Sequence, residues 1–562
     1  MTLDRRQMLF AVASLACVPD WVSAGDATAL DDVVKPLETV GGPGFALCVV
    51  RDGTILYQKF GGFADVEMKR TITIDSHFRL ASLSKAFTAM AVLALIERGD
   101  LSFDTRLPQV FPGFPAYGDA ITLRHLLNHT SGLLDFGTLI PAGQTAQLRD
   151  GDVLEMMKRV GATKFPPGSK FEYSNTGYVL LGLVVQHASG SPFGTFLRKA
   201  VFGPVGMKTT RIYEGETTPI ASRAYGYIRD GDGFRRKDQS LMSALQGDGC
   251  IYSSVREMVQ WDRALTRGTL VRADLMRAAF TSGHLNDGTA TGYGFGWFVD
   301  AVNGHRRLWH SGGTVGFSHH FVRLPDDRLS VILLTNRGDA SPEAITDRMA
   351  AAIIPGLKPP EPLVHPVARE RLQVLQGYYD LRGSLTTIVI EDGKLNWLGA
   401  GPKPVVLLPT SETTFFYESA ELNPDRNWRL RFEARADTAI ERISYVVNDK
   451  VVFTLPYLGP LCSDLSHQAH ADPEPEFTRR LAAWLKGEEG GGLPPLSERP
   501  AAAVNASPEF LGRYTPNAIA TRSQRTVAKV HNYALSTDKS PVWLVVSRAG
   551  DGSVLGADVV PA

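Results

Sequence analysis

The sequence lacks most of the features that would assign it to a specialised class of protein. Only 4 of its 562 residues are cysteines, and they are far apart with no C-x-x-C pair, which excludes a disulfide scaffold and argues against a cysteine metal site. Lysine plus arginine and aspartate plus glutamate both number 59, so the formal net charge is zero. Without a basic excess we expect no nucleic-acid partner and no bulk attraction to an anionic membrane. At ~150 residues per domain, the length predicts three to four globular domains.

The first 24 residues carry a short hydrophobic run. Arg5 and Arg6 precede an apolar stretch at residues 8–16, and small residues follow at 22–24. A charged start, a short apolar core and an A-x-A-like end are typical of an export signal, and the adjacent arginines favour a twin-arginine signal. The apolar stretch is too short to span a bilayer comfortably. We therefore expect residues 1–24 to direct export to the periplasm.

A second interpretation of this segment involves lipid attachment. Residues 14–17 resemble a bacterial lipobox, in which Cys17 would be acylated and would anchor the chain to a membrane. We prefer cleavage near Ala24, because the small-residue site lies at a better distance from the apolar core. A membrane partner is expected only if Cys17 is lipidated.

Proline and glycine divide the remainder of the chain. Residues 30–355 mix strand-like segments with long apolar helical stretches, and prolines then crowd residues 356–370, which predicts a linker. A second loose stretch rich in proline and glycine occupies residues 461–507. Short alternating segments predict two small all-β, barrel-like domains at 371–460 and 508–562. The strand-like segments of the first are 385–390, 428–432 and 450–455.

The S-x-x-K tetrad from Ser82 to Lys85 is the first sign of chemistry. It opens an apolar, helix-forming stretch at residues 84–98 that stops at Gly99, a favourable helix C-cap. Residues three apart share a helix face, so the Lys85 amine can lie beside the Ser82 hydroxyl, which is a weak nucleophile until a base takes its proton. A second S-x-x-K at residues 536–539 lies among polar residues without an apolar helix, and we interpret it as a solvated turn.

Two further motifs follow in the chain. Tyr173 and Asn175 form the only Y-x-N among the tyrosines, and His310-Ser311-Gly312-Gly313 follows a strand-like segment. The order S-x-x-K, Y-x-N and K/H-x-G resembles the penicillin-recognising serine hydrolases: class C β-lactamases, D-alanyl-D-alanine carboxypeptidases, D-aminopeptidases and related esterases. Segments 126–133 and 292–297 also resemble that family. The resemblance covers residues 30–355 and implies a helical subdomain beside an α/β subdomain built on an antiparallel sheet, with the site between them.

The resemblance also implies roles for individual residues. Ser82 would be the acylated nucleophile, with Lys85 as its basic neighbour and Tyr173 as a proton relay, and which of the last two is the formal base stays open. Asn175 would bind the amide or acyl part of the substrate. The backbone N–H groups of Ser82 and Gly313 would form the oxyanion hole. The site would need no metal or other cofactor.

The triplet departs from the family pattern, because His310 stands where many relatives have lysine. We expect His310 to act in catalysis, and Ser311, Gly312 and Gly313 to contact substrate. A histidine is mostly uncharged near neutral pH, so we predict an alkaline activity optimum. A neutral group also holds a substrate carboxylate less well than a lysine does, which puts penicillins and C-terminal D-Ala peptides in doubt.

The domain layout, one catalytic domain followed by two β domains, is similar to that of D-aminopeptidases. We therefore expect a D-amino-acid-specific peptidase acting on a small-molecule or short-peptide substrate. The alternatives are a β-lactamase-family esterase, a β-lactamase or DD-carboxypeptidase, and, from another class, a catalytically idle protein that binds or senses cell-wall fragments. Fold-level analogy is a limited warrant for choosing among them.

Several other residues suggest chemistry but favour structural roles. His125 and His129 have zinc-helix spacing without the glutamate of H-E-x-x-H. His319 and His320 point to opposite faces if they lie in a strand. The remaining residues of this kind favour core packing or a tight loop: Cys48, Asp248, Cys250, Tyr293 and Trp309.

Overall fold

The computed structural model describes most of the first 360 residues and the strands that follow. The described residues are 24–141, 144–215, 217–230, 233–340, 342–358, 365–381, 384–391, 393–398, 405–418, 428–434, 440–447, 450–459, 509–514, 529–536, 542–548 and 554–561. The predicted export signal with Cys17, the linker at 461–507 and most of the second S-x-x-K lie outside them, apart from Ala24 and Ser536. None of the described helices is long and apolar enough to cross a membrane.

The described residues form two compact units. The first is drawn from Met1–Asn128, Gln147–Asp152 and Gly177–Pro360, and the second from His129–Ala146, Val153–Thr176 and Glu361–Ala562. Each unit is therefore assembled from separate stretches of chain, and the predicted domain boundaries stay predictions.

Thirteen α-helices lie within the described residues. Their bounds are α1 Ala24–Val34, α2 Ser84–Arg98, α3 Leu107–Val110, α4 Leu123–Leu127, α5 Asp150–Lys158, α6 Asn175–Ser189, α7 Phe193–Leu197, α8 Gly203–Val205, α9 Gln246–Gly249, α10 Val255–Arg267, α11 Ala273–Ala279, α12 Pro342–Ile353 and α13 Arg369–Leu375. The predicted helix at 84–98 is confirmed with both ends, because Gly99 adopts the left-handed conformation (φ 83°) that ends α2.

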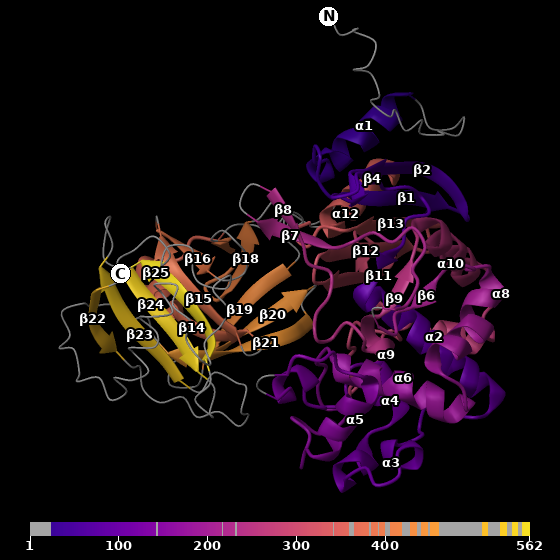
Figure 1. Cartoon of the computed structure of the whole chain (residues 1–562), viewed down its shortest axis with the longest axis horizontal. Coiled ribbons are helices and arrows are strands. Elements are labelled where there is room, and N and C mark those ends of the chain that lie inside the picture. Colours follow the sequence, from indigo (N-terminus) through magenta and orange to yellow (C-terminus); the bar gives the residue numbers. More distant parts are fainter. Residues whose placement is uncertain are drawn as a thin grey trace, which may run out of the picture. The chain divides into compact units, whose positions relative to one another are not determined.

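A six-stranded antiparallel sheet is the framework of the first unit (Figure 1). Its strands, in order across the sheet, are β10 Phe298–Val302, β11 His305–Thr314, β12 Phe317–Leu324, β13 Leu329–Thr335, β1 Phe45–Arg51 and β2 Thr54–Gly61. The predicted strands at 45–50 and 330–336 pair with each other as β1 and β13. The turn after β1 is tight, because Asp52 and Gly53 both have positive φ (50° and 75°).

Helices cover both faces of this sheet. On one face Thr346 of α12 contacts His320 of β12, and on the other Asp262 of α10 accepts a hydrogen bond from Arg323 of the same strand at 2.7 Å. Side chains of opposite parity point to opposite faces of a strand. The buried strands are consequently apolar along most of their length, as in β13, where every residue is buried.

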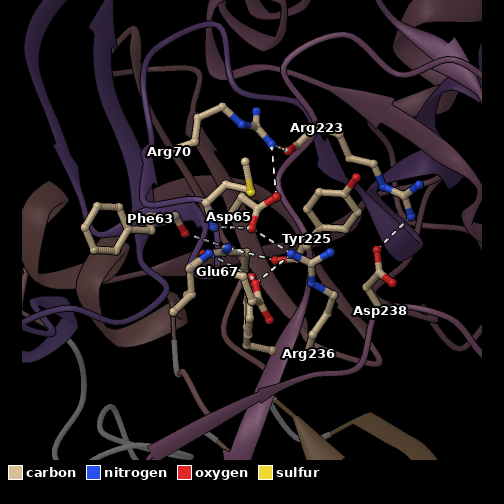
Figure 2. A network of polar contacts seen from close by, with 12 residues as sticks. Phe63, Asp65, Glu67, Arg70, Arg223, Tyr225, Arg236 and Asp238 are labelled. Atoms are coloured by element: carbon tan, nitrogen blue, oxygen red, sulfur yellow. Dashed lines mark hydrogen bonds and ion pairs between the residues drawn. The ribbon is translucent and has the colours of Figure 1, made fainter.

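Two small hairpins in the first unit are joined by ion pairs. The first hairpin consists of β3 Phe63–Asp65 and β4 Arg70–Thr71, and the second of β7 Tyr227–Asp230 and β8 Gly233–Arg236. Arg236 of β8 joins the hairpins through Asp65 and Glu67. We call these residues and the ion-paired side chains around them the polar clamp: Asp65, Glu67, Arg70, Arg223, Arg236 and Asp238 (Figure 2). A third small sheet has the strand order β5 Phe78–Arg79, β9 Ile251–Ser253 and β6 Arg211–Ile212.

The C-terminal strands belong to the second unit and confirm the all-β prediction. A closed barrel contains β14 Gly377–Leu381, β15 Ser384–Glu391, β16 Lys394–Leu398, β17 Val405–Pro409, β18 Thr414–Glu418, β19 Trp428–Ala434, β20 Ile440–Val447 and β21 Lys450–Gly459. Leu372 and Leu375 of α13 pack with Tyr379, Trp397 and Phe415 in its core. The four-stranded sheet that follows contains β22 Glu509–Tyr514, β23 Lys529–Ser536, β24 Val542–Arg548 and β25 Val554–Pro561.

Candidate active site

Ser82 and Lys85 lie where a single 3₁₀ turn, Ala81–Leu83, leads into α2. Ala81 has a positive φ of 49°, so the backbone bends sharply just before Ser82. The Lys85 Nζ atom donates a hydrogen bond to the Ser82 Oγ atom at 3.0 Å. Lys85 is fully buried, whereas Ser82 is partly exposed. The S-x-x-K spacing thus brings the two groups into contact as predicted, and their catalytic roles stay predictions.

The short helix α9 supports the ammonium group of Lys85. Lys85 Nζ donates a hydrogen bond to the main-chain carbonyl of Asp248 at 3.1 Å, and Thr88 Oγ1, one turn further along α2, donates to the carbonyl of Gly247 at 2.7 Å. A Cβ atom on Gly247 would lie 2.0 Å from the carbonyl oxygen of Tyr178, so only glycine fits there. Asp248 therefore lies close to Lys85, but in a single helical turn and not in the loop that we predicted.

The two described cysteines are unsuited to act as nucleophiles. Cys250 is completely buried at the end of the α9 turn, and burial raises the pKa of its thiol well above the usual range. Burial likewise raises the pKa of Cys48, in β1, to about 12. A thiol is nucleophilic only as the thiolate, so both cysteines have the inert character that we predicted for Cys48.

His310 lies on β11 and is almost completely buried (2% exposed). Its Nδ1 atom lies 2.6 Å from the Ser311 carbonyl oxygen, and its Nε2 atom lies 3.0 Å from the Tyr293 hydroxyl. A carbonyl only accepts, so Nδ1 carries the proton of the neutral ring and Nε2 accepts from the Tyr293 O–H. Burial and then the positive charge of Lys85 lower the pKa of His310 to about 3, against the opposing hydrogen bond to Ser311. His310 is therefore uncharged at neutral pH.

The glycine pair after His310 lies on a strand that passes close to the nucleophile turn. A Cβ atom on Gly312 would lie 2.3 Å from the Leu80 carbonyl oxygen, two residues before Ser82. Strand β10 pairs with β11 only from His305 to Trp309, so the strand from His310 to Thr314 extends past the end of β10. Gly313 is exposed there. An exposed main-chain segment beside Ser82 suits the predicted oxyanion hole, which stays a prediction.

Tyr173 and Asn175 lie at the N-terminal end of α6, within the second unit. The Tyr173 ring packs on the ring of His129, with 4.3 Å between ring centroids. The Ser174 N–H donates to His129 Nδ1 at 2.9 Å, and the Glu172 N–H donates to the His129 carbonyl at 2.9 Å. His129 therefore fixes the backbone on both sides of Tyr173. The proximity of Tyr173 and Asn175 to Ser82 stays a prediction.

The histidines that raised the question of a metal have other contacts. His125 caps its own helix through Thr122, with 3.2 Å between Nδ1 and Oγ1. His319 Nε2 lies 2.6 Å from the Arg79 carbonyl oxygen, while His320 Nδ1 lies 2.6 Å from Thr346 Oγ1 on the other face of the sheet, which confirms that the pair diverges. The part of the chain that the structure describes holds no cluster of three or more histidine, cysteine or acidic side chains suited to a metal ion.

Two residues near this site were not predicted from the sequence to contribute to it. Tyr293 is fully buried, as we predicted, but its hydroxyl also forms a hydrogen bond with the His310 ring. Its neighbour in the prediction, Trp309, has only the predicted packing role: it is buried and stacks on Phe298 with 4.3 Å between ring centroids. Asp150 is the second residue that was missed, and it contacts the α9 turn. Tyr293 belongs to the segment 292–297 that resembles the family, whereas no local pattern points to Asp150.

Comparisons with known proteins agree with this geometry. The family model described as Beta-lactamase matches residues 30–355, which is more than half of the chain. Penicillin-binding protein 4* of Bacillus subtilis (strain 168) is 33% identical over 388 residues, which cover 65% of this chain and 85% of that protein. A D-aminopeptidase of Cereibacter sphaeroides (strain ATCC 17029 / ATH 2.4.9) is 28% identical over 334 residues, and the match covers 58% of this chain and 63% of that enzyme.

A solved structure gives the same result. The D-amino acid amidase from Ochrobactrum anthropi SV3, complexed with L-phenylalanine amide, is 26% identical and superposes with a TM-score of 0.51 over 59% of this chain and 99% of that one. The predicted resemblance is therefore confirmed, together with the fold class. This chain belongs to the beta-lactamase family and is a serine hydrolase.

Proposed function

We propose that this protein is a D-amino-acid-specific peptidase that works through an acyl-enzyme on Ser82. Its substrates would be short peptides or amides with a D-residue at the amino end. The coarser function, serine hydrolysis, follows from the family, and the proposal concerns the bond and the substrate.

The reaction would run in two steps. In acylation the Ser82 oxygen attacks the substrate carbonyl carbon, a base drawn from Lys85 and Tyr173 takes the hydroxyl proton, and the leaving amine receives a proton as the C–N bond breaks. In deacylation a water molecule loses a proton to the same base and attacks the ester, and Ser82 recovers its proton as the C–O bond breaks. Main-chain N–H groups of Ser82 and Gly313 would stabilise the oxyanion in both steps.

The uncharged state of His310 is the observation that carries the substrate assignment. Both of its ring nitrogens are used by the protein, on Ser311 and Tyr293, and its pKa of about 3 leaves it neutral at any physiological pH. A neutral, internally bonded ring gives little electrostatic attraction to a substrate carboxylate. This favours substrates bound by the amino end, or esters, over penicillins and peptides ending in D-Ala.

The named activities of the relatives support the same choice. The matched relatives include several D-aminopeptidases at 28% identity, and the superposed structures include a D-amino acid amidase. Penicillin-binding protein 4*, by its name a protein that binds penicillin, supports the alternative of a β-lactamase or DD-carboxypeptidase.

Three chromogenic substrates test the proposal. D-Ala-p-nitroanilide, p-nitrophenyl butyrate and nitrocefin report peptidase, esterase and β-lactamase activity, and L-Ala-p-nitroanilide is the matched control for chirality. Among the three substrates, we expect the highest kcat/KM for D-Ala-p-nitroanilide. We expect a clearly lower kcat/KM for its L-isomer and loss of all activity in Ser82→Ala. A preference for nitrocefin, or equal rates on the two anilides, would contradict the substrate assignment and leave the hydrolase function standing.

A further inference from the structure

Asp150, the first residue of α5, is a buried carboxyl group with no role in the reaction described so far. Its side chain is 5% exposed. The Oδ1 atom accepts a hydrogen bond from the Gln246 N–H at 2.8 Å, and the Oδ2 atom has no hydrogen-bond partner among the described residues. A buried carboxyl group that is only half satisfied is costly, so its presence calls for an explanation.

The group that Asp150 holds is the start of the α9 turn. Gln246 is the first residue of α9, and Asp248, two residues later, gives its carbonyl to the Lys85 ammonium at 3.1 Å. The turn is also held from a second side by Thr88 Oγ1, which donates to the Gly247 carbonyl at 2.7 Å. The three contacts form a short chain from Asp150 to the amine beside Ser82.

The packing around this chain leaves the turn little freedom. A Cβ atom on Gly182 of α6 would lie 2.9 Å from the Gly247 Cα atom and 3.5 Å from Asp150 Oδ2. Gly182 and Gly247 thus bring the backbones of α6 and α9 together, with the Asp150 carboxyl group beside them. A displacement of Gln246 would be transmitted through this packed backbone to the carbonyl of Asp248.

We propose that Asp150 is a positioning residue for the Ser82–Lys85 pair: its carboxyl group holds the α9 turn, and the turn holds the Lys85 ammonium against Ser82. The inference rests on the proposed acyl-enzyme function, because it assigns a purpose to the position of Lys85. Asp150 does not touch the reacting atoms.

The charges around Asp150 indicate how it does this. Burial, with a smaller contribution from the negative charge of Asp248, raises the pKa of Asp150 to about 8. The hydrogen bond from the Gln246 N–H and the positive charge of Arg149 act in the opposite direction. The Cys250 thiol also interacts with Asp150, and burial is the main cause of its own raised pKa. The carboxyl group is therefore neutral at pH 7, and it works as a hydrogen-bond acceptor for Gln246 rather than as an anion.

The test is the rate at which a fluorophosphonate labels Ser82 in the full-length protein. Asp150→Ala removes the acceptor, whereas Asp150→Asn is neutral and keeps an oxygen for the Gln246 N–H. Glu257→Gln is the matched control, because Glu257 is also buried and accepts a backbone N–H, from Thr209 at 2.7 Å, but holds a different segment.

We expect Asp150→Ala to label about 10- to 100-fold more slowly, since small misplacements of catalytic groups cost this much. Asp150→Asn should stay within about 3-fold of wild type and Glu257→Gln within about 2-fold. With a turnover substrate, Asp150→Ala should lower kcat and leave KM within about 2-fold, because the group acts on the reacting pair and not on substrate binding.

Two results would overturn the inference: a folded Asp150→Ala that labels like wild type, or an Asp150→Asn as slow as Asp150→Ala. If Asp150→Ala does not fold, Thr88→Val removes the other side-chain anchor of the same turn and should slow labelling several-fold, and unchanged labelling in that variant would equally overturn it. A wild-type protein that labels no better than Ser82→Ala would instead defeat the proposed function itself.

Discussion

The floor of the candidate site and the polar clamp both hold ionisable side chains within the first unit, but they give them different partners. We define the site floor as Lys85, Asp150 and His310. The hydrogen bonds described above join these side chains to peptide carbonyls, a peptide N–H group and hydroxyls. In the polar clamp, guanidinium groups face carboxylates, as where Arg236 lies 2.7 Å from Asp65 and 2.6 Å from Glu67 (Figure 2).

This difference reverses the protonation of the same chemical group. Burial raises the pKa of Asp150 to about 8. Burial would also raise the pKa of Glu67, but hydrogen bonds from Tyr227 and Arg236 outweigh it and hold that pKa at about 2. A carboxyl group is therefore neutral in one region and charged in the other, because the partners, and not the residue type, decide which form is favoured. The buried groups of the site floor cost folding stability but hold the Ser82–Lys85 pair in place, whereas the ion pairs of the clamp stabilise the fold.

The largest effect is expected from removing the charge of the site floor. Lys85→Met should lower kcat/KM by about 10³-fold or more, because Ser82 loses its hydrogen-bonded amine. Its melting temperature should equal or exceed that of wild type, since a buried charge has been replaced by an apolar side chain. Steady-state kinetics and calorimetry measure the two quantities. A variant that keeps more than about a tenth of the activity would contradict the role of Lys85.

Stability as a function of pH separates Asp150 from the clamp. Asp150 has a raised pKa in the folded state (3.8 to about 8), so the folded protein binds more protons than the unfolded chain between these values, and stability falls as pH rises from about 4 to 8. The Asp150→Asn variant lacks this pH-dependent loss of stability. The free energy of unfolding of the variant, relative to that of wild type, should therefore rise between pH 4 and 8 by at most roughly 5 kcal/mol.

Denaturant unfolding at several pH values measures this difference. His310 acts in the opposite sense, because its lowered pKa costs stability as pH falls from 6.5 toward 3. That contribution is common to wild type and variant and cancels in the comparison. A wild-type-minus-variant difference that is independent of pH would show that Asp150 is not neutral in the folded protein.

Breaking the clamp should lower the stability and leave the activity unchanged, which is the reverse of the effect expected for Lys85→Met. Arg236→Met removes ion pairs to Asp65 and Glu67 and the stacking of the guanidinium on Tyr225, 4.0 Å from the ring centroid. Asp65 is buried and would lose one of its partners. We expect a loss of about 1–3 kcal/mol of stability with kcat/KM within about 2-fold of wild type. Arg236→Lys, which keeps the charge but not the planar stack, should lose less, and a loss of activity larger than the loss of stability would contradict the separation of the two regions.

The last prediction concerns the pH dependence of the rate. His310 stays neutral above its pKa of about 3, so it adds no positive charge to the site in the working range. We expect kcat/KM to be higher at pH 9 than at pH 6, because no second positive charge supports the site near neutral pH, and Arg236→Met to follow the same profile. A flat profile, or a maximum near pH 5, would contradict this expectation.

The residues that could be predicted from the sequence are those specified by local patterns. The apolar run ending at Gly99 fixes α2, three-residue spacing brings Lys85 to Ser82, and alternation separates His319 from His320. The contacts that could not be predicted join distant segments. The Gln246 N–H donates to the Asp150 carboxyl group, 96 residues away in the sequence. Because every residue except proline has a backbone N–H, the sequence around Asp150 contains no pattern that predicts this contact.

The charge state of the site was likewise only partly predictable. The replacement of lysine by histidine at position 310 indicated a less positive site, but the burial that lowers its pKa to about 3 comes from the packed sheet and from Tyr293. The same holds for the clamp, because Asp65 and Arg236 are 171 residues apart.

The central claim is that Ser82 is the acylated nucleophile, and intact-protein mass spectrometry after treatment with a fluorophosphonate tests it most directly. The wild-type protein should gain the mass of one adduct, mapped by peptide digestion to Ser82, and Ser82→Ala should gain none. A wild-type protein that stays unmodified, or an adduct that persists in Ser82→Ala, would contradict the account.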